Sequence, residues 1–209
     1  MKRSAARGRP AVNAATAAGA EQNLGEIVRR LRTARELSVR TLASRAGFAP
    51  SFISQVEHNQ ASPSIGSLQR LAGALGVSLG DFFRDPGGGA RPVTRATRRP
   101  HLTSWWSRAR IEALSPMGAG RRFEAVMVTL GIGGSSGKRA HAHAGEALAI
   151  VFDGVVRLTL GGEGLRLVAG DAVTLDPGTP HLWENPGPKP VRLVIVSTRF
   201  PTDLRTGPS

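Results

Sequence analysis

The chain of 209 residues contains no cysteine. Disulfide bonds, thiolate nucleophiles and sulfur-ligated zinc sites are therefore excluded, and any bound metal ion must be held by nitrogen and oxygen ligands. The sequence also lacks an apolar run of the roughly 18 to 20 residues that a membrane-spanning helix needs. Its basic, alanine-rich start has no leucine-dense segment of the kind that marks a secretory signal. We therefore expect a cytoplasmic protein without a membrane partner.

Acidic residues are scarce compared with basic ones, and the imbalance is uneven along the chain. The net charge is +13, and residues 86–110 contain six arginines and no acidic residue. Residues 111–209 carry ten basic and nine acidic residues, so nearly all of the excess lies in the N-terminal half. Such a distribution is typical of a domain that meets a polyanion such as nucleic acid. The alternative is that an Ala-, Gly- and Arg-rich composition reflects the base composition of the genome.

Changes in composition divide the chain into segments. Residues 1–22 are rich in alanine and arginine without apolar periodicity, which predicts a disordered basic tail. The segment DPGGGARP at 85–92 cannot continue a helix, because it combines proline with three glycines. We therefore predict one domain over 23–85, a linker over 86–104 and a second domain over 105–204.

The first domain has the apolar spacing of helices. Apolar residues recur at intervals of three and four in five short segments, at 24–36, 38–47, 50–59, 62–76 and 78–83. Gly47 suits the end of the second helix, and Ser62 or Ser64 suits the N-cap of the fourth. The pattern predicts a compact bundle of five helices.

The second domain has the pattern of short strands. Apolar runs rich in branched residues are separated by Gly, Asp and Pro: FEAVMVTLGIGG, LAIVFDGVVRLTLGG, LRLVAGDAVTLDPG and VRLVIVSTRF. Many short strands at near-regular spacing indicate an antiparallel sandwich or barrel. The fold class is therefore α plus β, in two domains.

The segment TLASRAGFAPSFISQVEHNQASPSIGSLQRLAGALGVSLGDFF resembles the lambda-repressor-like helix-turn-helix domain of the XRE family. Its second helix, the turn at Gly47 and the Ile53/Val56 core pair all fall in register with that family. A short helix, a tight turn and a second helix project the latter into a DNA major groove. The resemblance also matches Arg32 and Glu57 to an ion pair inside the bundle. We favour a structural bridge between the first and third helices for this pair.

Residues at the start of the third helix are expected to face base edges. They are Pro50, Ser51, Ser54 and Gln55, with Gln55 the best bidentate partner for adenine. We expect contacts to the DNA backbone from Arg40, from Asn59 and from amides near Ser64. Two departures from the family pattern weaken this set. Ala49 stands where the family often has a capping Ser or Thr, and Val39 where it often has a glutamine that touches phosphate.

The segment HAHAGEALAIVFDG at 141–154 resembles the first motif of the cupins, small double-stranded β-helix barrels. It supplies His141, His143 and Gly154, but Glu146 stands one position earlier than the motif requires. Because successive side chains of a strand point to opposite faces, this shift turns the carboxylate away from the barrel interior. The second motif supplies Gly170, Asp171, Gly178, His181 and Asn185, although Asp176 stands where proline is usual.

Three histidines therefore fall on cupin ligand positions: His141, His143 and His181. Three nitrogen ligands suffice in principle for Zn, Fe, Ni, Mn or Co. The alternatives are a metal-free ligand pocket, with Trp183 as a wall beside Asn185, or solvated histidines. For the adjacent Trp105 and Trp106 we expect packing in the core or between the domains, with ligand stacking as the alternative.

XRE-family regulators with a C-terminal cupin domain resemble this chain over nearly its whole length. The resemblance implies a homodimeric repressor that binds a pseudo-palindromic operator and senses a small molecule related to amines or amino acids. No catalytic base, nucleophile or oxyanion arrangement is evident beyond the histidine cluster, so we expect no enzyme. The alternative is a metal-dependent cupin oxygenase or isomerase with an attached DNA-binding domain. In a third interpretation, the barrel serves only to make the dimer.

Overall fold

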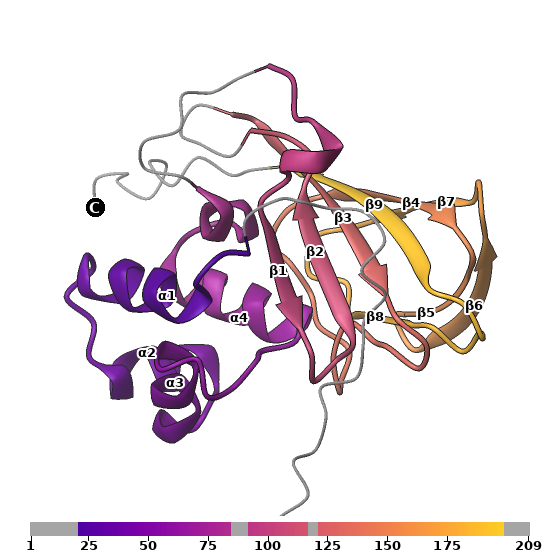
Figure 1. The fold of residues 1–209 in the computed structure, drawn as a ribbon. Coiled ribbons are helices and arrows are strands. Elements are labelled where there is room, and N and C mark those ends of the chain that lie inside the picture. Colours follow the sequence, from indigo (N-terminus) through magenta and orange to yellow (C-terminus); the bar gives the residue numbers. More distant parts are fainter. Residues whose placement is uncertain (1–20, 85–91, 117–120, 199–209) are drawn as a thin grey trace, which may run out of the picture.

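The computed structural model describes residues 21–84, 92–116 and 121–198 (Figure 1). The basic tail predicted over 1–22 lies almost entirely outside these residues. Within them, no helix is long and apolar enough to cross a membrane.

Four α-helices form the N-terminal bundle. They are α1 Leu24–Thr33, α2 Val39–Ala46, α3 Pro50–Glu57 and α4 Ile65–Leu75. The fifth predicted helix is the 3-10 helix η1, Leu79–Phe83, so the expected five α-helices are corrected to four. This segment spans only five residues, and short helical pieces of this length commonly adopt 3-10 geometry.

The helix ends follow from local sequence. Ser38 and Ser64 are N-caps whose side chains accept hydrogen bonds from Thr41 N and Ser67 N. Gly47 ends α2 in the left-handed conformation, at a φ of 65°, as the sequence predicts. Ala49 precedes α3 without a side-chain capping bond, which confirms that the usual cap is missing.

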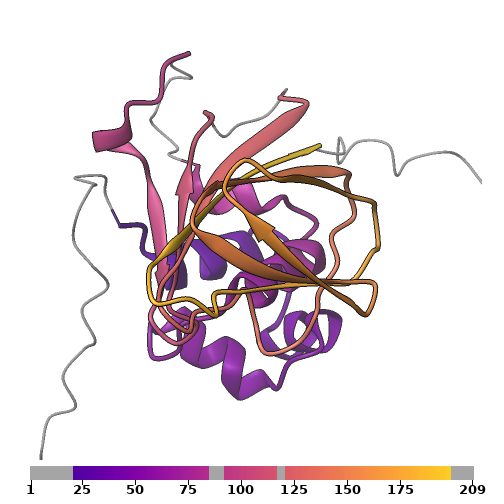
Figure 2. The same cartoon turned by 90° about the vertical axis from the view of Figure 1, so that its right-hand side faces the viewer.

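The C-terminal half consists of antiparallel strands in two sheets. The strands are β1 His101–Ser104, β2 Ala109–Ala113, β3 Phe123–Leu130, β4 Ala147–Asp153, β5 Val155–Leu160, β6 Glu163–Val168, β7 Ala172–Leu175, β8 His181–Glu184 and β9 Val191–Thr198. One sheet has the order β1-β2-β3-β9-β4-β7 and the other the order β6-β5-β8. Figure 2 shows the strands of both sheets arranged around one interior, as expected of a small barrel.

The range predicted as a linker contains folded structure. A 3-10 turn, η2 Ala96–Arg98, and strand β1 both lie within 86–104. Strand β1 pairs along its length with β2, with His101 opposite Glu112 and Ser104 opposite Ala109. The sheet therefore begins before residue 105. The composition of 86–104 does not reveal this strand, because the segment HLTS becomes a strand only by pairing with β2.

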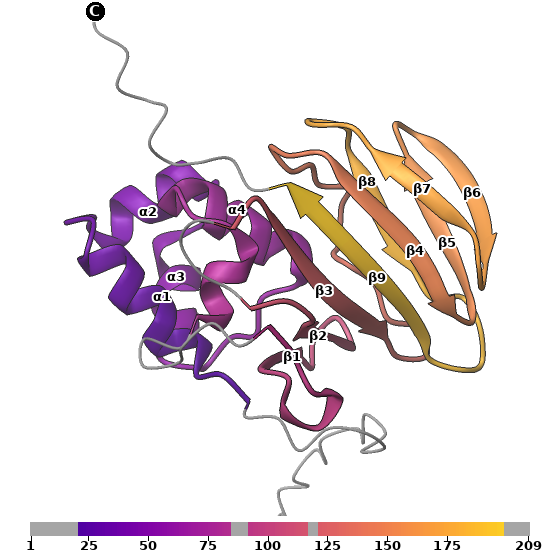
Figure 3. The ribbon, with the colours of Figure 1, turned by 90° about the horizontal axis from the view of Figure 1, so that it is seen from above.

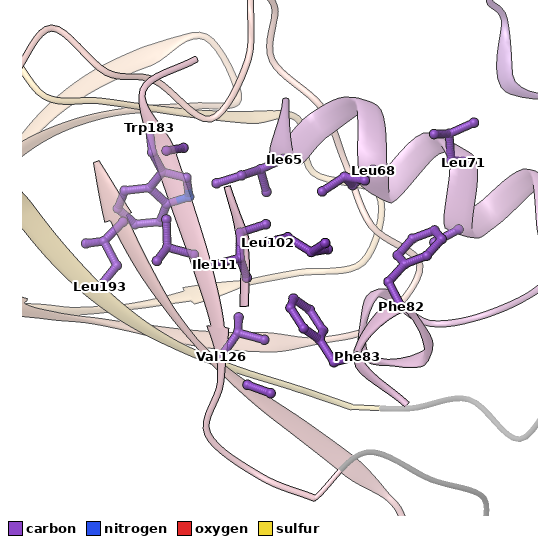
Figure 4. Close-up of a cluster of buried hydrophobic side chains, with 14 of the residues drawn as sticks. Ile65, Leu68, Leu71, Phe82, Phe83, Leu102, Ile111, Val126, Trp183 and Leu193 are labelled. Carbon is purple, nitrogen blue, oxygen red and sulfur yellow. The ribbon is translucent and has the colours of Figure 1, made fainter. Parts of the chain in front are cut away.

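The two halves share one hydrophobic core instead of having separate ones. Buried residues of α4 and η1 form one cluster with residues of β1, β2, β3, β8 and β9 (Figure 4). Figures 1 and 3 show the bundle against the β1–β3 end of the six-stranded sheet, with α4 nearest to it. Gly80 N, in η1, also donates a 3.0 Å hydrogen bond to Glu124 Oε2 on β3. The helical half is thus fixed against the barrel by buried contacts.

Candidate DNA-binding surface and histidine cluster

Helix α3 presents one face to its own bundle and the other to solvent. Ile53 and Val56 are buried, at 0% and 1% exposure, and anchor the helix. Pro50, Ser51 and Gln55 are exposed, so this face is available to a partner. Ser54 is half-buried, and its carbonyl accepts bonds from the backbone N and the Nδ1 of His58. The side chains expected to face bases therefore lie together on an exposed helix.

The ion pair predicted between Arg32 and Glu57 is confirmed. Arg32 Nε and Nη2 donate to the two carboxylate oxygens of Glu57 at 2.6 and 2.9 Å, and Nη1 donates to the Leu37 carbonyl at 2.8 Å. Both side chains are largely shielded from water, at 13% and 5% exposure. The carboxylate raises the pKa of Arg32 above its ordinary value, chiefly through the hydrogen bond. The pair joins the end of α3 to α1 and so fixes how far α3 projects.

Of the residues expected to contact the DNA backbone, Arg40 is exposed at the surface whereas Asn59 bonds within the bundle. Arg40 is exposed in the first turn of α2. Asn59 Oδ1 accepts from Gly25 N at 3.1 Å, while its amide donates to Asn23 Oδ1 at 3.0 Å. Its side chain therefore ties the end of α3 to the start of α1, in a left-handed backbone with φ of 56°.

The start of α4 faces the barrel. Gly66 N donates a 2.9 Å hydrogen bond to the carbonyl of Ser136, and Ser64 Oγ accepts from Ser67 N within its own helix. Ser136 is buried, and its Oγ also accepts from Trp183 N on β8. The sequence predicted that amides near Ser64 contact DNA phosphate; the amide of Gly66, at this helix start, instead bonds to the barrel.

The three predicted histidines come together at the edge of the barrel. The rings of His141 and His181 lie 4.6 Å apart between centroids, and those of His143 and His181 lie 5.2 Å apart. His181 begins β8, and the backbone of His141 pairs with it through reciprocal hydrogen bonds of 2.9 and 3.0 Å. His181 Nδ1 donates to the Thr179 carbonyl, and His143 Nδ1 to that of Gly145.

Burial lowers the pKa of two of these imidazoles and so favours their neutral form. It lowers the pKa of His141 to about 3, and the neighbouring ring of His181 adds to the effect. Burial also lowers the pKa of His181, in part opposed by its bond to the Thr179 carbonyl. The buried Nδ1 of His141 and Nε2 of His143 have no hydrogen-bond partner of good geometry among the described residues.

The carboxylate that would complete a metal site points away. Ala147, Ala149 and Val151 are buried on the inner face of β4, whereas Glu146 is exposed. The prediction that Glu146 faces away from the barrel interior, opposite to these three side chains, is thus confirmed. Over the described ranges, no three or more His, Cys, Asp or Glu side chains form a group arranged to hold a metal ion. The residues therefore form a histidine cluster that does not fit a metal centre as it stands.

Trp183 packs in the core and Asn185 bonds to the backbone of neighbouring loops. Trp183 is 2% exposed and packs in the common core near Ile65 (Figure 4). The amide nitrogen of Asn185 donates to the carbonyls of Leu130, Gly131 and Lys189, and its oxygen accepts from Gly187 N. Because its side-chain amide bonds to backbone groups on both sides, Asn185 holds the loop after β3 and the loop after β8 together.

The tandem tryptophans are not core residues. Trp105 and Trp106 are 55% and 61% exposed, which corrects the core-packing half of the expectation of packing in the core or between the domains. Trp106 lines a cleft of about 550 Å³ whose walls come from both halves of the chain. A Cβ added at Gly66 would lie 2.8 Å from His141 Nδ1, so these two residues also lie close together. Sequence periodicity missed both the cleft and this approach, because each joins residues from opposite halves.

Comparison with known proteins agrees with both halves of the fold. A helix-turn-helix family matches residues 28–82 and a cupin domain family matches residues 126–197. The HTH-type transcriptional regulator PuuR of Escherichia coli K12 is 28% identical over 178 residues, covering 85% of this chain and 95% of that protein. SutR of the same organism, another HTH-type transcriptional regulator, is 25% identical over 168 residues, covering 80% and 90%.

A solved structure has the same arrangement. The crystal structure of an HTH_3 family transcriptional regulator from Vibrio cholerae superposes with a TM-score of 0.66 at 18% identity. The match covers 86% of this chain and 97% of that one. It shows that the order of a helical bundle followed by a barrel is a shared fold.

Proposed function

We propose that the protein is a sequence-specific repressor with a small-molecule sensor in its barrel half. The proposal starts from the match of its two halves to a helix-turn-helix family and a cupin family and from its similarity to HTH-type transcriptional regulators. Helix α3 carries the proposal. It is anchored on one side by Ile53, Val56 and the pair Arg32–Glu57, and it exposes Ser51 and Gln55 on the other. Such a helix fits the width of a major groove.

The base-reading role centres on Gln55. Its amide can both donate to and accept from the major-groove edge of adenine, which Ser51 and Pro50 cannot do in a bidentate manner. Arg40, in the first turn of α2, supplies a cation for phosphate. With a single strong base reader on α3, the protein relies in part on the sequence-dependent shape of the duplex.

A homodimer is the proposed functional unit. One bundle reads one half-site, and two bundles related by a two-fold axis read half-sites about one helical turn apart. The operator is then a pseudo-palindrome, and its two halves are contacted by equivalent residues. We place this complex in the cytoplasm, where the DNA is.

The shared core provides the route from sensor to DNA. Helix α4 packs on the barrel through buried apolar residues and through the bond from Gly66 N to the Ser136 carbonyl. A ligand that favours one placement of the barrel loops therefore also favours one placement of the bundle. It changes operator affinity by at most the difference between its own affinities for the two placements.

The function is tested by selecting bound duplexes from a random pool with the full chain, followed by binding titrations at several salt concentrations. We expect enrichment of a palindromic sequence that binds about 10³-fold or more tightly than random duplex at physiological salt. The protein would not be a DNA-binding regulator if it ignored all duplexes at low ionic strength, where phosphate contacts are strongest.

A further inference from the structure

We propose that the cleft between the bundle and the barrel is a second ligand site, which binds a small organic anion with a flat apolar body. The cleft measures about 550 Å³, which is within the range of small-molecule pockets. Helix α4, the turn before α3 and Phe52 of α3 form one wall. The β1–β2 turn and the loop at 135–141 form the other.

The charge of the cleft selects an anion. Arg70, Lys138 and Arg139 line it, and its lining contains no acidic residue. Arg70 comes from the bundle, whereas Lys138 and Arg139 come from the barrel, so a bound anion would be attracted from both sides. Opposite charges in a partly enclosed cleft attract more strongly than on an open surface, since less water screens them.

Aromatic side chains contact two of these cations. The guanidinium of Arg70 lies 4.0 Å from the centroid of the Phe48 ring and donates to the Gly47 carbonyl. Lys138 Nζ lies 4.9 Å from the centroid of a ring of Trp106. The indole of Trp106 is 61% exposed, although burying such a ring is favourable. An apolar body that covers it gains that burial.

A buried imidazole lies at the inner end of the cleft. His141 lines the cleft, is only 8% exposed, and its Nδ1 lacks a hydrogen-bond partner of good geometry among the described residues. This nitrogen faces Gly66, since a Cβ added there would lie only 2.8 Å from it, so an occupant of the cleft meets the ring of His141 and not its Nδ1. The same ring contacts His181, so the cleft adjoins the histidine cluster.

An occupant of the cleft bridges the DNA-binding half and the barrel. For the effect on DNA this inference rests on the proposed function, whereas binding itself does not. A ligand held by Arg70 on one side and Lys138 on the other fixes the relative placement of α4 and the barrel loop. We expect it to change operator affinity without contacting Ser51 or Gln55, neither of which lines the cleft.

Binding is measured on the full chain by calorimetry, with DNA absent. The probes are benzoate, phenyl phosphate and indole-3-acetate, and the charge controls are benzamide and benzylamine. We expect saturable 1:1 binding of at least one anionic probe and none of the cation. Lys138→Glu and Trp106→Ala are each expected to weaken it about tenfold, the scale of one charge-assisted or stacking contact.

Matched controls separate the cleft from general charge and stickiness. Trp105→Ala removes the adjacent exposed indole, which does not line the cleft, and Arg157→Glu reverses a cation on β5. Both are expected to bind the probes as the unaltered chain does. If no anionic probe binds, or if the control variants lose binding as much as the cleft variants, the proposed site is overturned.

A second arm distinguishes a small anion from a DNA phosphate as the occupant. The site is a ligand pocket if saturating probe leaves binding to random duplex unchanged while Lys138→Glu abolishes the probe's effect on operator affinity. If Lys138→Glu instead weakens all duplexes equally and lowers the salt dependence, the cleft rim contacts DNA backbone and the small-molecule assignment is wrong.

Discussion

Gln55 is the residue whose chemistry most directly determines recognition. It is exposed near the middle of α3, between the buried Ile53 and Val56 that fix the helix. Gln55→Ala is expected to weaken cognate binding by about 1–3 kcal/mol, because a bidentate contact to a base is lost. Binding to random duplex is expected to stay unchanged. Fluorescence anisotropy on both duplexes measures the difference.

The control for that variant is Gln60→Ala, an exposed glutamine in the loop after α3. We expect it to leave the ratio of cognate to random affinity unchanged. An equal loss on both duplexes for Gln55→Ala would remove this residue from base recognition.

His141 makes stability depend on pH in one direction. Its pKa in the folded protein is lowered to about 3, below the value in the unfolded chain, so the unfolded state binds the proton more readily. The stability is therefore fully present above about pH 6.5 and is lost as pH falls toward about 3. The midpoint of urea unfolding, followed between these limits, is expected to fall steadily on acidification.

The variant His141→Asn tests the origin of this slope. It is expected to be less stable at neutral pH but to lose less stability on acidification, since one buried titrating group is gone. His58→Asn replaces an exposed imidazole and should keep the original slope. Identical slopes in all three proteins would assign the acid sensitivity elsewhere.

Metal uptake by the histidine cluster is expected to be weak. Glu146 points outward, and within the described segments no three or more ligand-type side chains form a metal-holding group. Untagged protein refilled with Zn, Fe, Ni, Mn or Co and then desalted should retain less than about a tenth of an equivalent, given how strongly complete sites retain metal. Retention near one equivalent, abolished by His181→Ala, would show that the cluster rearranges into a metal site.

At the scale of elements, the position of α3 depends on the pair Arg32–Glu57. Removal of one partner leaves a shielded charge without compensation, because the two side chains are only 13% and 5% exposed. Arg32→Ala is therefore expected to destabilise the protein by about 3–5 kcal/mol. Chemical denaturation monitored by circular dichroism measures this loss.

The barrel offers a matched exposed pair. Arg192 Nη2 and Asp153 Oδ2 lie 3.0 Å apart, with side chains 44% and 57% exposed. Asp153→Ala is expected to cost about 0–1 kcal/mol, because water screens the pair. Equal losses of unfolding free energy in the two variants would show that burial does not strengthen the Arg32–Glu57 pair.

At the scale of the whole molecule, the two halves approach each other closely at Gly66. A Cβ added there would lie 2.8 Å from His141 Nδ1 and 2.9 Å from its Cγ, closer than real contacts allow. Gly66→Ala is therefore expected to push α4 from the barrel and to cost about 1–3 kcal/mol of stability. It is also expected to uncouple ligand binding from operator affinity.

Gly73 provides the control within the same helix. A Cβ added there meets nothing within 4 Å, so Gly73→Ala is expected to stabilise the protein by about 0.5–1 kcal/mol through reduced backbone freedom. Urea unfolding of both variants compares the two sites. A neutral effect of Gly66→Ala would mean that the halves do not depend on this close contact.

Local rules in the sequence determined much of this protein. The turn at Gly47, the cap at Ser64 (one of the two serines that the sequence offered) and the helix of Gln55 follow from spacing and capping chemistry, which act within a few residues. The outward position of Glu146 likewise follows from the alternation of strand side chains. Such features need no distant partner, and they were predicted.

Only the tertiary structure decided which polar groups from distant parts of the chain become hydrogen-bond partners. The amide of Gly66 binds the Ser136 carbonyl, and Asn59 bonds Gly25 and Asn23. Trp106 lies at a cleft between the halves. Spacing records which face of an element is apolar, but it does not record which distant backbone group a polar side chain or amide will meet. That choice depends on how the bundle packs on the barrel.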